Sequence, residues 1–166
     1  MVLHLDAVLT YQASDMVLAG HSNALHLSKT KARSRAGRHF FMSNNTTFPP
    51  NNGAVFTIAI IIKNVMSLVA EAELIALLIN CKEAIPARRE LEEMGHKQPP
   101  TPIQTDNATA HGMVTNNIAI KWLNSMDIRL LWLRYRATKG KFRHYWRAGA
   151  TNLGDYVTKH HAVIHH

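Results

Sequence analysis

Hydrophobic positions follow two different patterns along this chain, and the pattern changes near residue 62. Before that point, dense apolar stretches separated by turn residues predict three successive strands, at residues 16–27, 39–43 and 54–62. The segment 29–38 is rich in lysine and arginine and is expected to be a basic hairpin connection, and 44–53 consists of turn residues. Three strands in succession predict an antiparallel meander.

After this meander the apolar positions take a helical period. A helix over about residues 65–84 is predicted by one apolar stripe, formed by Leu74, Leu77, Leu78, Cys81 and Ile85. Pro86 suits the first position of a helix and Gly95 suits a helix end, so a second, short helix is expected between them.

The rest of the chain alternates strands and helices. Short strands are predicted at 103–105 and 141–147, and helices at 118–138 and 153–159. A further short helix is expected to start from Asp106 and Asn107, whose side chains suit an N-cap. The predicted fold is α/β, a five-stranded mixed sheet in which the antiparallel meander is joined by two parallel strands and flanked by helices. The domain is expected to span 16–160, with a lead-in at 1–15 and a His-rich tail at 161–166.

Composition narrows the class of partner more than the class of fold. The chain has 166 residues, 46% hydrophobic and 18% charged, as in a globular domain. Its formal net charge of +8 favours a polyanionic partner, nucleic acid before a membrane surface. No apolar run is long enough for a membrane span and no signal peptide is evident, so an intracellular location is expected. Cys81 is the only cysteine and is expected to be an inert core residue.

Four positions stand out in these elements: Asn23 in the first strand, Glu73 on the first long helix, Asp106 directly after the fourth strand and Asp155 at the start of the last helix. Ligands gather at the carboxyl ends of strands in α/β proteins, which is where Asp106 lies. Three short words surround the acids: AEAELIAL at 70–77, QTDNATA at 104–110 and NLGDYVTK at 152–159. In this order and spacing they resemble the ribonuclease H domain of copia-type LTR retrotransposon polyproteins, where the blocks run roughly AEAEY-x-A, CDNQSA and LAD-x-x-TK. The resemblance covers about residues 16–161 and implies a ribonuclease H-like fold.

The resemblance also implies an activity, hydrolysis of the RNA strand of an RNA–DNA hybrid by two Mg²⁺ or Mn²⁺ ions. Mg²⁺ is a hard ion that prefers oxygen ligands and keeps several waters, which suits a small group of carboxylates. By this resemblance the metal ligands are Glu73, Asp106 and Asp155, with Glu71 as the near alternative on the first helix. The ordinary structural roles of these acids are an exposed helix glutamate and helix caps.

One departure from the family is decisive for activity. The family has an Asp in the first strand, in a word like SDAS, whereas this chain has His21-Ser22-Asn23-Ala24. Asp6 and Asp15 do not replace it, because Asp15 comes about eight residues earlier, more than about 20 Å along an extended strand. An amide carries no negative charge, so cleavage is expected to be absent or severely reduced. The loop 147–150 also lacks the His that cellular ribonucleases H place before the last helix.

Other features have both a functional and a structural interpretation. The basic hairpin is expected either to follow hybrid phosphates or to be a solvated loop, and its residues are Lys29, Lys31, Arg33, Arg35 and Arg38. Stacking on bases or packing in the core are the alternatives for Trp122, Trp132 and Trp146. A metal-binding tract or a frayed end are the alternatives for the terminal histidines, His160, His161, His165 and His166.

The first functional hypothesis is a copia-type ribonuclease H-like domain, impaired in this copy, that belongs beside the reverse transcriptase of the same polyprotein. The second is a non-catalytic nucleic-acid-binding domain or retroelement relic that grips hybrid or duplex. A strand-transfer enzyme such as an integrase shares the sheet but places its final acid as a Glu on a late helix, whereas here the late acid is Asp155.

Overall fold

A five-stranded mixed sheet forms the centre of the computed structural model, which describes residues 10–115 and 127–159. The strand order is β3-β2-β1-β4-β5. Antiparallel pairs join β1 to β2 and β2 to β3, and parallel pairs join β1 to β4 and β4 to β5. The strands are β1 (Val17–Lys29), β2 (Arg33–Ser43), β3 (Ala54–Ile61), β4 (Thr101–Thr105) and β5 (Phe142–Trp146). The predicted meander with two added parallel strands is confirmed.

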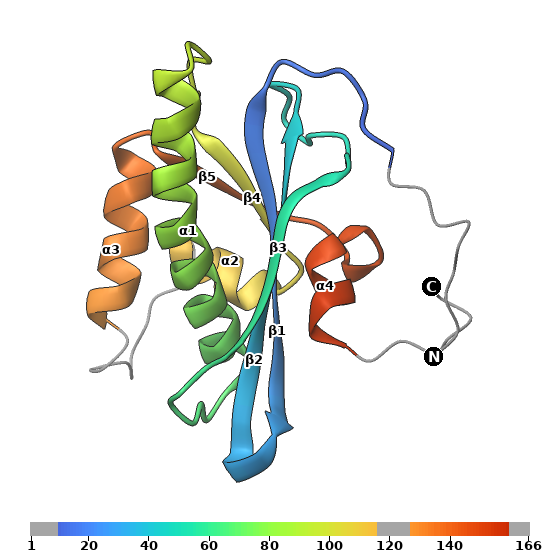
Figure 1. Ribbon diagram of the computed structural model, residues 1–166. Coiled ribbons are helices and arrows are strands. Elements are labelled where there is room, and N and C mark those ends of the chain that lie inside the picture. The colour runs from blue at the N-terminus through green and yellow to red at the C-terminus, as the bar shows by residue number, and fades with distance from the viewer. Residues whose placement is uncertain (1–9, 116–126, 160–166) are drawn as a thin grey trace, which may run out of the picture.

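Helices cover both faces of this sheet, as Figure 1 shows. On one face lie α1 (Val69–Glu93), α2 (Ala108–Val114) and α3 (Asp127–Thr138), and α4 (Leu153–Thr158) packs on the other face, against β1 and β2. Short 3-10 turns occur at Thr30–Ala32 and Gly149–Thr151. The predicted helix 118–138 falls partly outside the described residues. No described helix has the length and apolar character that crossing a bilayer requires.

The core fills the space between the sheet and α1. Fully buried side chains from the strands, such as Leu18, Phe40 and Ile103, meet Leu74 and Leu77 of the helix. Cys81 is buried in the same cluster, as expected. Burial of this apolar area is the main favourable term for the fold.

The prediction of two helices around Pro86 is wrong, because α1 is a single helix that contains Pro86. Proline removes one backbone donor, but Pro86 lies on the exposed side of the helix, where water can reach the carbonyl that loses its partner. Ala84 and Arg88 are buried on either side of it. Packing of this face on the sheet outweighs the local preference of proline to begin a helix.

The prediction for the basic segment is also wrong, because β2 begins at Arg33 rather than near residue 39 and the connection is only the turn Thr30–Ala32. Residues 33–43 pair with β1 across most of their length. The basic side chains alternate with small buried ones, Ser34 and Ala36, so the segment has the period of a strand. The turn places Lys31 and Ala32 at φ of 61° and 51°, a region that usually favours glycine.

Helix α4 approaches the sheet at a glycine. A Cβ atom added at Gly37 of β2 would lie 2.8 Å from Val157 Cγ2 and 2.9 Å from the Gly154 carbonyl oxygen. Only a residue without a side chain leaves room for the helix here. Gly37 therefore fixes how closely the helix that carries Asp155 lies against β1 and β2.

The described part of the lead-in lies along the loop between β2 and β3. The Tyr11 hydroxyl donates to the Ala54 carbonyl at 2.9 Å, and the Gln12 backbone exchanges two hydrogen bonds with the Asn52 side chain, at 2.8 and 2.9 Å.

Candidate active site

The four predicted site positions converge where β4 ends beside β1. Strand β4 pairs with β1 only at Gly20 and His21 and stops at Thr105, so the edge of β1 beyond this point has no strand partner on that side. Glu73 fills the gap from α1, and its Oε1 accepts the Ala24 backbone N–H at 2.9 Å. Asp106 follows β4 directly, and Asp155 enters from α4 on the opposite face.

Glu73 is the most buried acid of the group, with only 3% of its surface exposed. Its Oε2 has no hydrogen-bond partner among the described residues. Burial raises the pKa of Glu73 to about 8, the Ala24 hydrogen bond opposes that rise, and the charges of Asp106 and Asp155 add to it. Three acids that are far apart in the sequence therefore lie near enough for their charges to act on one another.

Glu71, the alternative on the same helix, has a structural role instead. Its Oε2 accepts the backbone N–H groups of Ser67 and Leu68, at 2.9 and 3.2 Å, and so caps the start of α1.

Asp106 lies half-buried, and its pKa is raised by burial first and then by the charge of Asp155, while Lys159 and Asn152 act in the opposite direction. The cap of α2 is Asn107, whose side chain accepts from Ala110 N at 2.9 Å. Asp106 is therefore not needed as the cap. A Cβ added at Gly149 would lie 3.0 Å from Asp106 Oδ2, so a glycine at this point keeps the Asp106 carboxylate uncovered.

Asp155 and Asn23 are hydrogen-bonded to each other. The Asn23 amide nitrogen donates to Asp155 Oδ1 at 3.0 Å and to Thr158 Oγ1 at 2.6 Å. Lys159 Nζ lies 2.7 Å from Asp155 Oδ1 and 2.9 Å from Oδ2. Both oxygens of the Asp155 carboxylate therefore already have donors from within the chain.

The start of α4 is held against β1 by two residues that the sequence did not single out. Asn152 donates through its side chain to the Ser22 carbonyl at 2.9 Å, and the Leu153 N–H donates to His21 Nδ1 at 2.9 Å. Burial lowers the pKa of His21 to about 3, with the charges of His39 and Arg147 adding to the effect. His21 therefore stays neutral at physiological pH and accepts this bond. The only sequence signal was its position two residues before Asn23.

The residues do not fit a divalent metal ion as they are arranged. Within 10–115 and 127–159, no three His, Cys, Asp or Glu side chains form a group that could hold one. Asp155 would first have to give up the Asn23 amide and the Lys159 ammonium. The unpartnered oxygen of Glu73 and the mutual repulsion of Asp106 and Asp155 are the remaining features of a cation site.

Asp15 of the lead-in does not join the cluster. Asp15 is exposed, and its Oδ2 accepts the Asn45 backbone N–H at 3.1 Å, at the other end of β1. Asp6 lies outside the described residues, as do the terminal histidines and Trp122.

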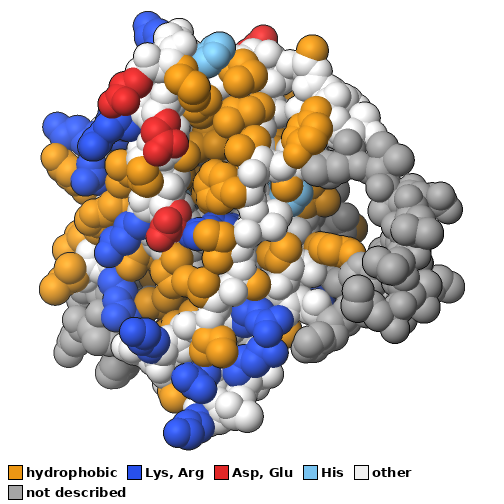
Figure 2. Space-filling model, in the orientation of Figure 1, with side chains coloured by type: hydrophobic (Ala, Val, Ile, Leu, Met, Phe, Trp, Pro, Cys, Tyr) orange, Lys and Arg blue, Asp and Glu red, His pale blue; other side chains and the backbone are white. Residues whose placement is uncertain are grey.

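The basic hairpin projects beyond the sheet, and Figure 2 shows Lys and Arg side chains gathered at that end of the molecule. Its outward residues, wholly or partly exposed, are Lys29, Lys31, Arg33 and Arg35. Arg38 is a correction to the predicted set, because it is 3% exposed and lies beneath α1, 3.9 Å from Glu83 and over the Phe56 ring. Its position in β2 directs the side chain to the face of the sheet that α1 covers, whereas Arg35 points to the opposite face.

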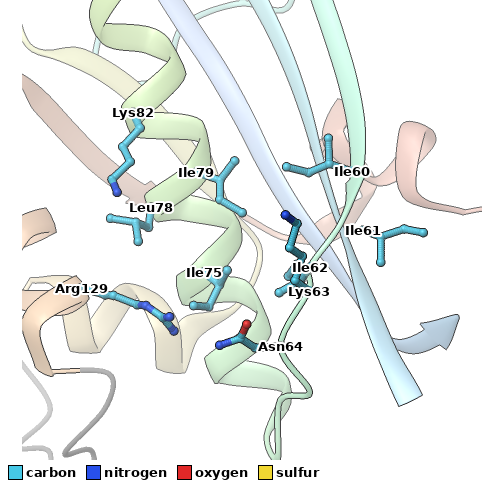
Figure 3. A pocket seen from close by; sticks show the side chains of 10 residues that line it. All are labelled: Ile60, Ile61, Ile62, Lys63, Asn64, Ile75, Leu78, Ile79, Lys82 and Arg129. Carbon is cyan, nitrogen blue, oxygen red and sulfur yellow. The ribbon is translucent and has the colours of Figure 1, made fainter. Parts of the chain in front are cut away.

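A separate groove of about 360 Å³ lies between β3 and α1, with an apolar floor that includes Ile60 and Ile79 (Figures 2 and 3). Lys63, Lys82 and Arg129 line it as well, and its lining contains no carboxylate. It is therefore not part of the acid cluster.

Comparison by sequence finds no matching family model and no matching curated protein. Comparison by structure finds ribonuclease H domains. The N-terminal RNase H domain of a Mycobacterium tuberculosis protein aligns with a TM-score of 0.61 and 11% identity, covering 86% of this chain and 91% of that one. LC11-RNase H1, isolated from compost by a metagenomic approach, aligns at 0.65 and 8% identity, covering 86% and 92%.

A viral protein also aligns by structure. The foamy viral protease-reverse transcriptase in complex with dsDNA gives a TM-score of 0.51 at 15% identity, covering 91% of this chain and 96% of that one. LC11-RNase H1 has also been solved in complex with an RNA/DNA hybrid. The order and direction of the strands match these neighbours, so the chain has a ribonuclease H-like fold.

Proposed function

We propose that this chain is the ribonuclease H-like domain of a copia-type retrotransposon Pol polyprotein, and that in this copy hydrolysis of the RNA strand of RNA–DNA hybrids is lost or severely impaired. The fold supports the class, and the three sequence words that surround the acids support the copia type. The partner in the polyprotein would be its reverse transcriptase. A location inside the cell, in cytoplasm, virus-like particle or nucleus, accords with that origin.

The hydrogen bond between Asn23 and Asp155 carries the proposal of impairment. An aspartate at position 23 would put two carboxylates about 3 Å apart, an arrangement that repels unless a cation lies between them. The amide removes this need, because its N–H satisfies Asp155 directly, and Lys159 neutralises the same carboxylate. The chain has thereby replaced a cation requirement with internal contacts. An intact site would hold two Mg²⁺ or Mn²⁺ ions on these carboxylates and an aspartate at position 23.

What the present residues can still do is bind an anionic strand. The basic hairpin joins β1, which carries Asn23, to β2. The formal net charge of +8 also favours binding to phosphates. A binding role without cleavage is therefore the second candidate function. The burial of Glu73 and the hydrogen bond from Asn23 to Asp155 favour it for this copy.

Restoring the missing acid tests the proposal. Asn23→Asp is expected to produce Mg²⁺-dependent cleavage of the RNA strand of a labelled hybrid, while the unchanged chain gives at most a trace. The Asn23→Asp/Asp106→Asn double variant is the matched control and should be silent. Silence of Asn23→Asp itself, with the folded state verified by circular dichroism, would contradict a damaged nuclease and leave the binding role.

A further inference from the structure

A hollow of about 470 Å³ lies at the outer edge of β5, beside the acid cluster but separate from it. Aromatic rings make up most of its lining. Tyr145 and His144 of β5 are buried, and Phe48 and Trp146 are 54% and 47% exposed. His111 of α2 completes the aromatic set. Exposed flat rings beside buried ones form an open slot that a planar group could enter.

His144 is the unexplained residue of this hollow. It is 8% exposed, and neither of its ring nitrogens has a hydrogen-bond partner among the described residues. Leaving a buried polar group without a hydrogen bond costs about 1–3 kcal/mol of folding free energy. A bound ligand that pairs with His144 would recover this cost. Burial, and then the charge of His111, lower the pKa of His144 to about 4, so at neutral pH the ring offers one donor and one acceptor. His144 lines the hollow, so a ligand that enters it comes next to a ring whose nitrogens have no other partner among the described residues.

The hollow is built in, rather than left by a loose loop. Arg143 donates to the Thr46 and Thr47 carbonyls at 2.7 and 2.6 Å and so ties the loop that carries Phe48 to β5. The Arg147 guanidinium lies 5.6 Å from the centre of the Phe48 ring. These contacts hold an aromatic wall and a positive charge at fixed places around the slot.

The slot is also tied to the acid cluster. Trp146 Nε1 donates to the Asp106 backbone carbonyl at 3.0 Å. A strand whose backbone passes Asp106 would therefore bring a neighbouring nucleotide to Trp146. A nucleobase has a flat π-face that can stack on the aromatic rings, and its edge carries the donors and acceptors that could pair with the His144 nitrogens. The phosphates of the same strand would suit the positive charge of Arg147. An apolar protein side chain would satisfy the rings but leave His144 unpaired.

We propose that the hollow lined by Phe48, His111, His144, Tyr145 and Trp146 is a nucleobase-binding pocket, which takes one unpaired base of a nucleic-acid strand that lies across the acid cluster. This proposal depends on the proposed nucleic-acid function, and it adds that the bound strand must offer an unpaired base. It requires a base that is free of its pair, so single-stranded nucleic acid, or a frayed end of a hybrid, is the ligand class.

The test measures binding alone, in EDTA, so that it does not depend on cleavage. Fluorescence anisotropy compares a short oligothymidylate with an abasic phosphodiester strand of the same length and charge, at fixed salt. The full chain is expected to bind the thymidylate at least about fivefold more tightly, as expected for one stacked base. Phe48→Ala/Trp146→Ala should remove that preference and leave abasic binding unchanged. These two side chains are exposed, so their loss should not prevent folding.

Two further variants make the test specific. Tyr135→Ala is the matched control, since Tyr135 is an exposed ring beside a lysine on α3 and lines no part of the pocket; it should keep the preference. His144→Phe keeps a ring but removes both nitrogens, so it should raise the melting temperature and lower the preference. Equal binding of base and abasic strands by the full chain, or an unchanged preference in Phe48→Ala/Trp146→Ala, would overturn the pocket. An unchanged preference in His144→Phe would overturn the role of His144. Failure of Asn23→Asp to cleave bears only on the proposed nuclease origin.

Discussion

Single residues decide what the acid cluster can do. Glu73 accepts a backbone hydrogen bond at the edge of β1, where a further strand would otherwise pair. Asn23 donates a hydrogen bond to Asp155, where an aspartate would need a cation between the two carboxylates. The acid that is closest to neutral is Glu73, because it is buried and faces two other carboxylates. The site is thus held in a state of low charge by its own residues.

Replacement of Glu73 by glutamine should therefore stabilise the chain at high pH. Unfolded glutamate releases its proton near pH 4.5, whereas folded Glu73 keeps it to about 8, so the unfolded state binds fewer protons in between and stability falls as pH rises through that window. Glu73→Gln should remove this loss, a gain of a few kcal/mol at pH 9 and little change at pH 4.5. Urea unfolding in EDTA at the two pH values measures it. A variant less stable than the parent at pH 9 would contradict the raised pKa.

The sequence could predict the acids at this scale but not their environment. The words around Glu73, Asp106 and Asp155 suggested their positions, and the structure brings all three together. Burial of Glu73 depends on the packing of α1 against the edge of β1, a contact between segments distant in sequence that no local pattern records. Core packing was one of the two alternatives for Trp146, yet its side chain lies exposed at the sheet edge, because alternation gives the face of a strand and not what covers that face.

At the scale of elements, β1 and α4 set the geometry of the site. Helix α4 is only six residues long, so its position depends on the sheet beneath it and on the Asn152 and His21 contacts at its start. Gly37 allows the helix to lie close enough for Asn23 and Thr158 to bond.

Gly37→Ala should displace α4 and loosen this part of the site. The added methyl would lie 2.8 Å from Val157 Cγ2 and 2.9 Å from the Gly154 oxygen, contacts that force backbone movement. We expect a loss of about 1–3 kcal/mol in the free energy of unfolding, and faster hydrogen exchange in 153–159 than in α1. Unchanged exchange in 153–159 would show that the close approach is not required.

Local patterns predicted the elements well where tertiary packing agreed with them, and failed where it did not. Pro86 is a strong local signal for a helix start, but the buried face of α1 continues through it. The segment 33–38 has the composition of a loop, but ten rungs of pairing between β1 and β2 make it a strand. In both cases a local residue preference was outweighed by contacts with residues distant in the sequence.

At the scale of the whole molecule, stability should pass through a maximum with pH. His21 and His144 are buried with pKa values lowered to about 3 and about 4, while the unfolded chain binds protons at these residues near pH 6.5, so stability is lost as pH falls below that value. Glu73 causes the opposite loss as pH rises towards 8. Thermal melts from pH 3 to 9 should therefore peak between about 5 and 7. A melting temperature that rises steadily to pH 9 would contradict this account.

An amide at position 23 holds Asp155 within the acid site, so no cation is needed there. The ribonuclease H-like fold therefore persists without a cation, because Asn23 and Lys159 already satisfy the Asp155 carboxylate. A carboxylate returned to position 23 is expected to restore the need for a cation.

The most direct measurement is the melting temperature of the parent and of Asn23→Asp, each in EDTA and in millimolar Mg²⁺. We expect Mg²⁺ to leave the melting temperature of the parent unchanged. Asn23→Asp should melt several degrees lower in EDTA, because about 1–2 kcal/mol of repulsion is added, and should recover in Mg²⁺. Asn23→Ser is the control without added charge and should not respond to Mg²⁺. A parent that is itself stabilised by Mg²⁺, or an Asn23→Asp variant indifferent to it, would contradict the account.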